Sequence, residues 1–89
     1  MYKVFYTDHA RRDLKNIDFH IAQKIIKKIH FFSTQKNPLK FAKQLKNPLL
    51  GAYRFRIGDY RAIFDTNKKG NIIMLMILRI KQRKDIYNL

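Results

Sequence analysis

Three arginines, Arg54, Arg56 and Arg61, are spaced so that a single β-hairpin would bring them together. The residues on either side of Gly58-Asp59 alternate in type, and glycine at the first of two central positions favours a tight hairpin turn. In such a hairpin Arg56 lies directly opposite Arg61, and all three guanidinium groups project from one face. Like charges repel across a strand pair, so this face disfavours folding but suits an anion such as phosphate, whose oxygens match the guanidinium fork.

The other side chains of this hairpin form an apolar face, which predicts the side of a sheet that packs on the core. These residues are Tyr53, Phe55, Ile57, Tyr60, Ala62 and Phe64. An alternative interpretation of the arginine face is a solvated sheet surface, on which Asp65 at the far end moderates the charge. We favour an anion site, because three guanidinium groups on one face are a typical footprint of phosphate recognition.

Groups that commonly serve catalysis are scarce in this sequence. It has no cysteine, and its six acidic residues are all aspartates spread along the chain. This composition excludes thiolate catalysis and zinc fingers and disfavours a hard-metal site, so we expect neither metal nor cofactor. The histidines, His9, His20 and His30, lack the spacing of metal ligands on a helix. Arg, Lys and Tyr suit RNA cleavage by the substrate's own 2′-hydroxyl, in which the protein orients the nucleophile and stabilises the phosphorane.

The elements that must position the arginines follow from the spacing of apolar residues. Ile21, Ile25, Ile29 and Phe32 recur at helical spacing and predict an amphipathic helix, preceded by a short helix over 10–15. In chain order we expect a strand at 2–6, these two helices, a helical turn within 38–46, and strands at 53–57, 60–65 and 72–78. The last run is wholly apolar, which predicts a central strand buried on both faces. The order β-α-α-β-β-β defines an α+β domain, in which a helical hairpin packs on one face of an antiparallel meander.

The chain has 89 residues and a net charge of +14, and its length predicts a single domain over residues 1–89. Such an excess of positive charge predicts an acidic partner, which could be nucleic acid, an anionic membrane or an acidic protein. The longest apolar run, 72–78, is much shorter than the roughly 20 residues that cross a bilayer. We therefore expect no membrane span, and the absence of cysteine fits a cytoplasmic protein.

Residues 51–64, with the sequence GAYRFRIGDYRAIF, resemble the most characteristic segment of the RelE/ParE toxin superfamily. Leu45-Lys46 before this segment and QRKDIY at 82–87 after it extend the resemblance over nearly the whole chain. The resemblance implies a RelE-like fold and a toxin of a toxin–antitoxin pair. For the RelE-like branch it further implies a metal-independent mRNA interferase, an endoribonuclease that cuts mRNA on the ribosome. An acidic antitoxin would cover the basic site, and the toxin would be a monomer alone and a heterodimer or heterotetramer with its antitoxin.

The resemblance also implies roles for individual residues. Arg61 and Arg56 would stabilise and clamp the phosphate, while Lys81 and Tyr87 would assist proton transfer or stack on a base. The further RNA contacts that we expect are Arg54, Arg79, Arg83, Lys84 and Lys46.

One position departs from the pattern of the family. Gln82 stands where many members carry a histidine, and glutamine cannot act as a general acid or base, so proton transfer would fall to Lys81 or Tyr87. Two alternatives therefore stay open. The first is a ParE-like inhibitor of DNA gyrase, because the GDYR sequence is common to both branches. The second is a non-toxic, degenerate homologue that only binds RNA or an antitoxin.

Overall fold

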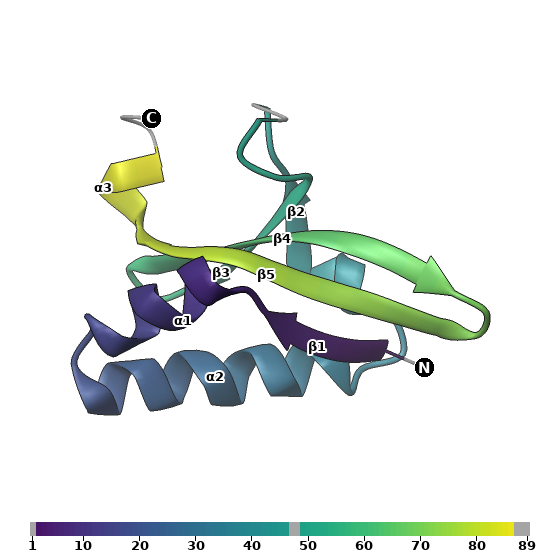
Figure 1. Ribbon diagram of the computed structural model, residues 1–89, viewed down its shortest axis with the longest axis horizontal. Coiled ribbons are helices and arrows are strands. Elements are labelled where there is room, and N and C mark those ends of the chain that lie inside the picture. The colour runs from purple at the N-terminus through teal and green to yellow at the C-terminus, as the bar shows by residue number, and fades with distance from the viewer. Residues whose placement is uncertain (1, 47–48, 87–89) are drawn as a thin grey trace.

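The computed structural model describes residues 2–46 and 49–86, which form a five-stranded sheet covered on one face by two helices (Figure 1). The strands lie side by side in the order β1-β5-β4-β3-β2. The elements in chain order are β1 (Tyr2–Tyr6), α1 (Asp8–Lys15), α2 (Phe19–Ser33), the 3-10 helix η1 (Pro38–Phe41), β2 (Ala42–Gln44), β3 (Tyr53–Ile57), β4 (Tyr60–Lys69), β5 (Ile72–Gln82) and α3 (Arg83–Ile86). The predicted α+β class is therefore confirmed. No helix in the described part of the chain is long and apolar enough to cross a membrane.

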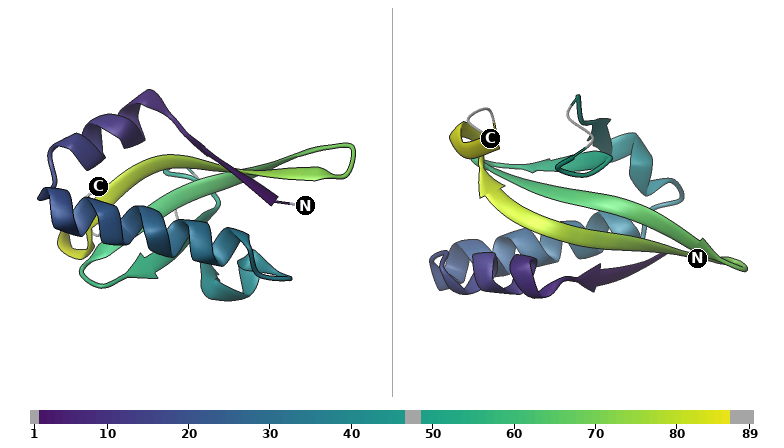
Figure 2. Two further views of the ribbon diagram at one scale, coloured as in Figure 1. Left: turned by 90° about the horizontal axis from the view of Figure 1, so that it is seen from below. Right: turned by 45° about the horizontal axis from the view of Figure 1, so that its top comes forward.

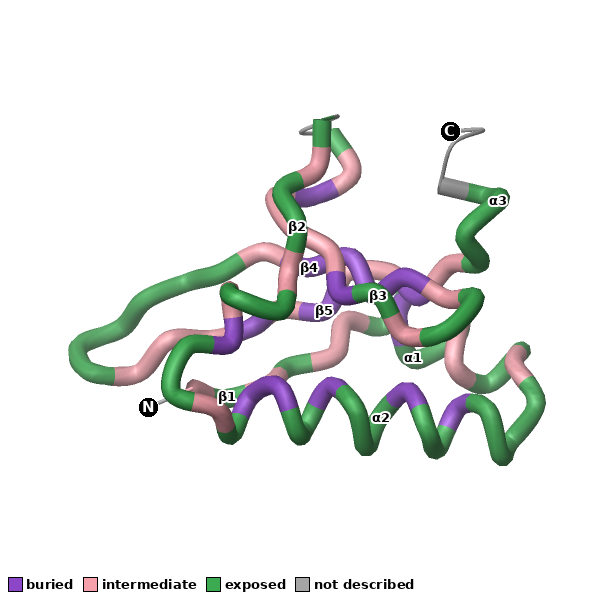
Figure 3. Tube along the Cα trace, turned by 180° about the vertical axis from the view of Figure 1, so that it is seen from behind, coloured by how far each residue is buried: buried purple, intermediate pink, exposed green. Residues whose placement is uncertain are grey.

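Each helix of the α1–α2 hairpin begins with a side-chain cap. Thr7 Oγ1 accepts a hydrogen bond from the N–H of Ala10 at 3.2 Å, and Asp18 Oδ1 accepts one from the N–H of His20 at 3.0 Å. α2 then runs along the sheet (Figure 2), and its buried positions recur on the side that faces the sheet (Figure 3). The predicted apolar stripe is thus confirmed, except that Ile21 at its margin is 41% exposed.

The core lies between α2 and the sheet and contains a row of aromatic rings. The ring of Phe32 lies 4.7 Å from that of Phe55, and Phe55 stacks on Phe64 at 4.3 Å. Both sheet residues are fully buried, as the apolar face of the predicted hairpin requires. Burial of side chains of this size contributes about 1.5–3 kcal/mol each, so this row fixes α2 on the strands that carry the arginines.

The predicted antiparallel meander is present in β3, β4 and β5. The strand expected over 60–65 is too short, because β4 continues to Lys69 and pairs there with Ile72, so that the turn falls at Gly70-Asn71. The strand expected over 72–78 extends beyond these residues. It has neighbours on both sides in the sheet, as a central strand does, but it is not buried on both faces. Only Leu75 and Ile77 of that run are buried, since the far end of the β4–β5 hairpin projects beyond the helices (Figure 1).

Two strand pairings were not anticipated from the sequence. β1 lies parallel to β5 at one edge of the sheet, with Tyr2 opposite Ile73. At the other edge, the helical turn expected within 38–46 is correct only for η1, and the chain then extends into β2, which pairs antiparallel with β3. β2 adds a strand beside the predicted arginine hairpin.

The sheet face that carries the arginines is partly covered by the segment that precedes β3. Gly51 has φ 146, and a Cβ atom there would lie 2.7 Å from Cγ2 of the buried Ile63. Asp65 Oδ1 accepts a hydrogen bond from the N–H of Ala52 at 2.7 Å, so this carboxylate anchors the covering segment. The cover ends before Arg56 and Arg61, whose end of the face is where a pocket forms.

Candidate anion-binding site

A pocket of about 380 Å³ lies on the arginine face of the sheet. Its lining comes from five elements and consists of Phe41, Lys43, Arg54, Arg56, Arg61 and Arg83. All six of the chain's aspartates lie in the described residues, and none of them lines this pocket. Five cationic side chains around one recess create a strong positive potential, which attracts an anion. We call this recess the cationic pocket.

The hairpin turn sets the register that brings the arginines together. Gly58 has φ 60, as the first central position of a type II′ turn requires. In the described chain, only glycines have a positive φ. Arg56 pairs with Arg61 and Ile57 with Tyr60, which is the register expected from the sequence. The pairing of β2 adds Lys43 directly opposite Arg54. The turn and the pairing of β2 with β3 thus place cations from three adjacent strands on one surface.

Arg61 is the buried member of the cationic pocket, with only 3% of the residue exposed. Its Nη1 donates hydrogen bonds to the carbonyl oxygens of Gly58 and Tyr60, each at 2.9 Å. These bonds hold the guanidinium against the turn. A cation removed from water interacts with a nearby anion at a lower effective dielectric constant, so an anion in this recess would interact more strongly with Arg61 than with an exposed cation.

The chain that follows β5 closes another side of the cationic pocket. The N–H of Arg83 donates to the carbonyl oxygen of Asp59 at 2.8 Å, which fastens the start of α3 to the hairpin turn. Nε2 of Gln82 donates to the hydroxyl of Tyr60 at 3.3 Å. Gln82 and Arg83 therefore both contact the hairpin of β3 and β4.

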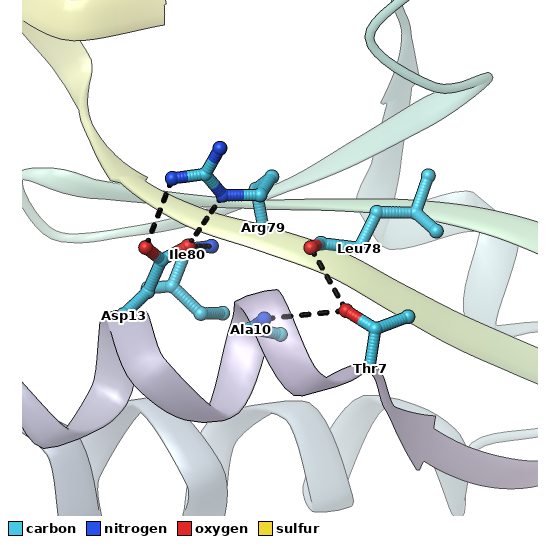
Figure 4. Close-up of polar contacts among 6 residues, drawn as sticks. All are labelled: Thr7, Ala10, Asp13, Leu78, Arg79 and Ile80. Carbon is cyan, nitrogen blue, oxygen red and sulfur yellow. Dashed lines mark hydrogen bonds and ion pairs between the residues drawn. The ribbon is translucent and has the colours of Figure 1, made fainter.

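Arg79 lies away from the cationic pocket, where it pairs with Asp13 of α1 (Figure 4). Its Nε and Nη2 donate to the two carboxylate oxygens at 2.9 and 3.1 Å, and the N–H of Ile80 donates to Oδ2 at 2.9 Å. Burial acts to raise the pKa of the Asp13 carboxyl, but the hydrogen bonds from Arg79 and Ile80 outweigh it, and the pKa lies below its usual value. Arg79 thus joins α1 to β5, and the structure does not bring it to the other predicted RNA contacts.

Three further predicted residues, Lys81, Lys46 and Lys84, are not part of the lining. Lys81 is half-buried and lies opposite Arg61 in the pairing of β4 with β5. Lys46 and Lys84 are exposed, and Lys84 borders a smaller recess of about 290 Å³ that includes Asp59. Tyr87 lies outside the described residues.

Two lining residues, Phe41 and Lys43, were missed by sequence reasoning. Both lie in the segment that was expected to be helical, and only the pairing of β2 with β3 brings them to the arginines. A hint was present in the sequence, because a lysine stands between Ala42 and Gln44 in a run that could pair with the strand at 53–57. Within residues 2–46 and 49–86, no three His or Asp side chains lie together in a way that could hold a metal ion.

Comparison with known proteins identifies related chains over almost the full length. The model of the family "ParE toxin of type II toxin-antitoxin system, parDE" matches residues 4–87. Toxin RelG of Mycobacterium tuberculosis is 31% identical over 86 residues, which cover 97% of this chain and 95% of RelG. In the RelBE2 toxin–antitoxin complex of the same organism, one chain matches with a TM-score of 0.68 and 27% identity, covering 92% of this chain and 98% of that one. The RelE–RelB complex from Pyrococcus horikoshii shares the fold, with a TM-score of 0.64 at 24% identity over 92% of this chain and 94% of that one.

The five-stranded sheet, the helical hairpin on one face and the cationic pocket on the other define a toxin domain of the RelE-like fold. The chain belongs to the ParE toxin family, within the RelE/ParE superfamily. It is therefore a toxin of a type II toxin–antitoxin system.

Proposed function

We propose that this toxin is an endoribonuclease that cuts mRNA on the ribosome, without a metal or a cofactor. The observation that carries the proposal is the cationic pocket, in which five Lys and Arg side chains surround one recess. A single scissile phosphate, with further phosphates on either side, fits such a recess. The similarity to RelG and to the toxin chain of RelBE2 supports an activity on RNA rather than another function of the positively charged pocket.

The proposed reaction takes its nucleophile from the RNA. The 2′-oxygen of one ribose attacks the adjacent phosphorus and loses its proton, the bond from phosphorus to the 5′-oxygen breaks, and that oxygen gains a proton. The products are a 2′,3′-cyclic phosphate and a 5′-hydroxyl. Charge develops on the two non-bridging oxygens, so preorganised guanidinium groups beside them lower the barrier. Removal of one such donor typically slows a reaction about 100- to 1,000-fold.

The side chains divide these tasks by their position. Arg61, buried and held by the turn carbonyls, stabilises the phosphorane, and the exposed Arg56 opposite it clamps the same phosphate. Arg54 and Arg83 hold the neighbouring backbone, to which Lys43 contributes a further charge. Proton transfer falls to Lys81, which lies across from Arg61. The family resemblance, rather than its position, assigns a share of it to Tyr87.

The same positive surface supports an antitoxin as the second partner. The RelBE2 and RelE–RelB relatives were solved as toxin–antitoxin complexes. We propose that an acidic antitoxin covers the cationic pocket in the cytoplasm and keeps RNA out. The free toxin is then a monomer, and the complex is a heterodimer or a heterotetramer.

A second candidate function is inhibition of DNA gyrase, because the family model that matches residues 4–87 is that of ParE. A third is a non-toxic homologue that only binds RNA or an antitoxin. Its reason is Gln82, which stands where the family resemblance leads us to expect a histidine. Both alternatives keep the fold, and they predict no cleavage of mRNA.

The test is to induce the chain alone in a bacterial host and map mRNA 5′ ends on the ribosomes. We expect growth arrest with new ends at defined positions within codons. The exposed Arg56→Ala variant should lose both effects, whereas Lys68→Ala, an exposed cation at the far end of the β4–β5 hairpin, should keep them. Arrest with intact mRNA and with DNA damage would support gyrase inhibition, and growth without arrest would support the non-toxic homologue.

A further inference from the structure

An exposed aromatic ring stands at the rim of the cationic pocket. Phe41 is 43% exposed, although large apolar side chains usually lie inside a domain. Its ring stacks on Phe32 with the centroids 5.0 Å apart and the planes 23° apart, and Phe31 contacts it edge-on at 6.4 Å. Phe32 in turn packs on Phe55 of the core. The position of the Phe41 ring is therefore fixed by the aromatic row, with Phe32 against one of its faces.

Phe41 also lines a second recess, of about 650 Å³. The other lining residues are Tyr2, Gln35, Lys36, Asn37 and Lys40. This recess, which we call the amide recess, combines two cations, two side-chain amides and a tyrosine, and none of the chain's six aspartates lines it. The ring of Phe41 is thus shared by two neighbouring positively charged recesses.

We infer that Phe41 is a stacking platform for a nucleobase of single-stranded RNA whose phosphate lies in the cationic pocket and whose chain continues toward Lys36 and Lys40. This inference rests on the proposed function and names a binding residue and a second subsite for it. Single-stranded nucleic acids are held by basic grooves that follow the backbone and by aromatic rings on which successive bases stack. Phe41 supplies the ring between two basic recesses, and the amide of Asn37, which makes no capping bond to the helix η1, can bond to the edge of a further base.

An acidic protein segment is the other occupant that the charges of this surface would admit. The two occupants make different demands on position 41. An apolar side chain of a protein packs against leucine as well as against phenylalanine, whereas a base needs the flat π-face of a ring. The continuity of the ring with the cationic pocket favours RNA, because stacking places the base beside its own phosphate.

The test measures binding of the purified chain to a 2′-O-methyl RNA hexamer, which cannot be cleaved, with 2-aminopurine as a fluorescent base. We expect quenching on binding, a loss of affinity of about 5- to 100-fold in Phe41→Leu, and little loss in Phe41→Tyr, which keeps the ring. Phe19→Leu is the matched control, because Phe19 is 67% exposed on α2 and lines neither recess. Thermal melts of each variant show whether the fold is retained.

The dependence on salt separates stacking from charge. Phe41→Leu should leave the slope of log affinity against log salt unchanged, whereas Arg56→Ala should reduce that slope by about one. Equal affinities of Phe41→Leu and the parent chain, a changed slope in Phe41→Leu, or no quenching by the parent chain would each overturn the inference. If Phe41→Leu weakens antitoxin binding but not RNA binding, the surface serves the antitoxin instead. The binding assay needs no cleavage, so it can fail while mRNA is still cut, and it can succeed if no mRNA is cut.

Discussion

Replacing Asp13 with alanine removes the carboxylate that fastens α1 to β5. In the parent protein this group accepts two hydrogen bonds from Arg79 and one from the N–H of Ile80. The Arg79 side chain is 37% exposed, so solvent screens part of its interaction. Ile80 is only 4% exposed, and its N–H would lose its acceptor in the alanine variant. An orphaned buried donor costs about 1–3 kcal/mol, so the total loss of stability should be about 2–3 kcal/mol.

The assay for this prediction is thermal unfolding followed by circular dichroism. In a domain of this size, about 1 kcal/mol corresponds to roughly 4–8 °C, so Asp13→Ala should melt about 10–20 °C below the parent. Asp13→Asn keeps an acceptor for the N–H of Ile80 and should lose less. Asp8→Ala has the same net charge as Asp13→Ala, but Asp8 is exposed in the first turn of α1, so its loss should stay below about 1 kcal/mol. If Asp13→Ala melts no lower than Asp8→Ala, the three hydrogen bonds do not stabilise the junction of α1 with β5.

The stabilisation by Asp13 should also depend on pH. The pKa of its carboxyl is lowered in the folded protein, so the unfolded chain takes up this proton at a higher pH than the folded chain does. The contribution is therefore complete above the unfolded pKa of about 4 and is lost as the pH falls through the lower folded value. The difference in melting temperature between the parent and Asp13→Ala should shrink in that acidic range and stay constant from about pH 5 to 8.

Three further predictions concern other parts of the molecule. Burial raises the pKa of Tyr6 to about 12, so the parent should lose stability relative to Tyr6→Phe between about pH 10 and 12. Denaturant unfolding of both proteins at several pH values measures this difference. If their unfolding free energies change in parallel with pH, the prediction is contradicted. Gly51→Ala should destabilise the fold by at least about 1–3 kcal/mol in the same unfolding assay, because φ 146 disfavours a side chain and its Cβ would meet Ile63. Gly70→Ala, with open space around it, should cost less, and an equal cost would refute the packing argument. Lys43→Ala should weaken the binding of single-stranded RNA and reduce its salt slope by about one, and an unchanged slope would place Lys43 outside the phosphate path.

The arginine hairpin could be predicted because its information is local. Alternation of side chains and the Gly58-Asp59 turn determine the register within a dozen residues, and the structure has Arg56 opposite Arg61 as expected. The helix α2 was predictable for the same reason, since its apolar period repeats over several turns. Local patterns of this kind leave few alternative pairings.

Contacts between distant segments were the part that sequence reasoning could not supply. Arg79 resembles the other cations of the C-terminal segment, but its partner Asp13 lies 66 positions earlier in the chain. β2 has only three residues, none of them β-branched, and it becomes a strand because β3 offers an edge. Lys43 and Phe41 reach the cationic pocket only through that pairing, so neither could be assigned to the site beforehand.

The most direct test of the proposed function uses purified ribosomes that carry a defined mRNA. The purified chain should cut this mRNA at one position and leave a 2′,3′-cyclic phosphate and a 5′-hydroxyl. The Arg56→Ala variant should cut at least about 100-fold more slowly, while Lys68→Ala should match the parent. An otherwise identical mRNA with a single 2′-deoxy nucleotide before the scissile phosphate should stay intact at that position. Cleavage of the deoxy-substituted mRNA at the parent rate, or no cleavage of either mRNA by the parent chain, would contradict the account.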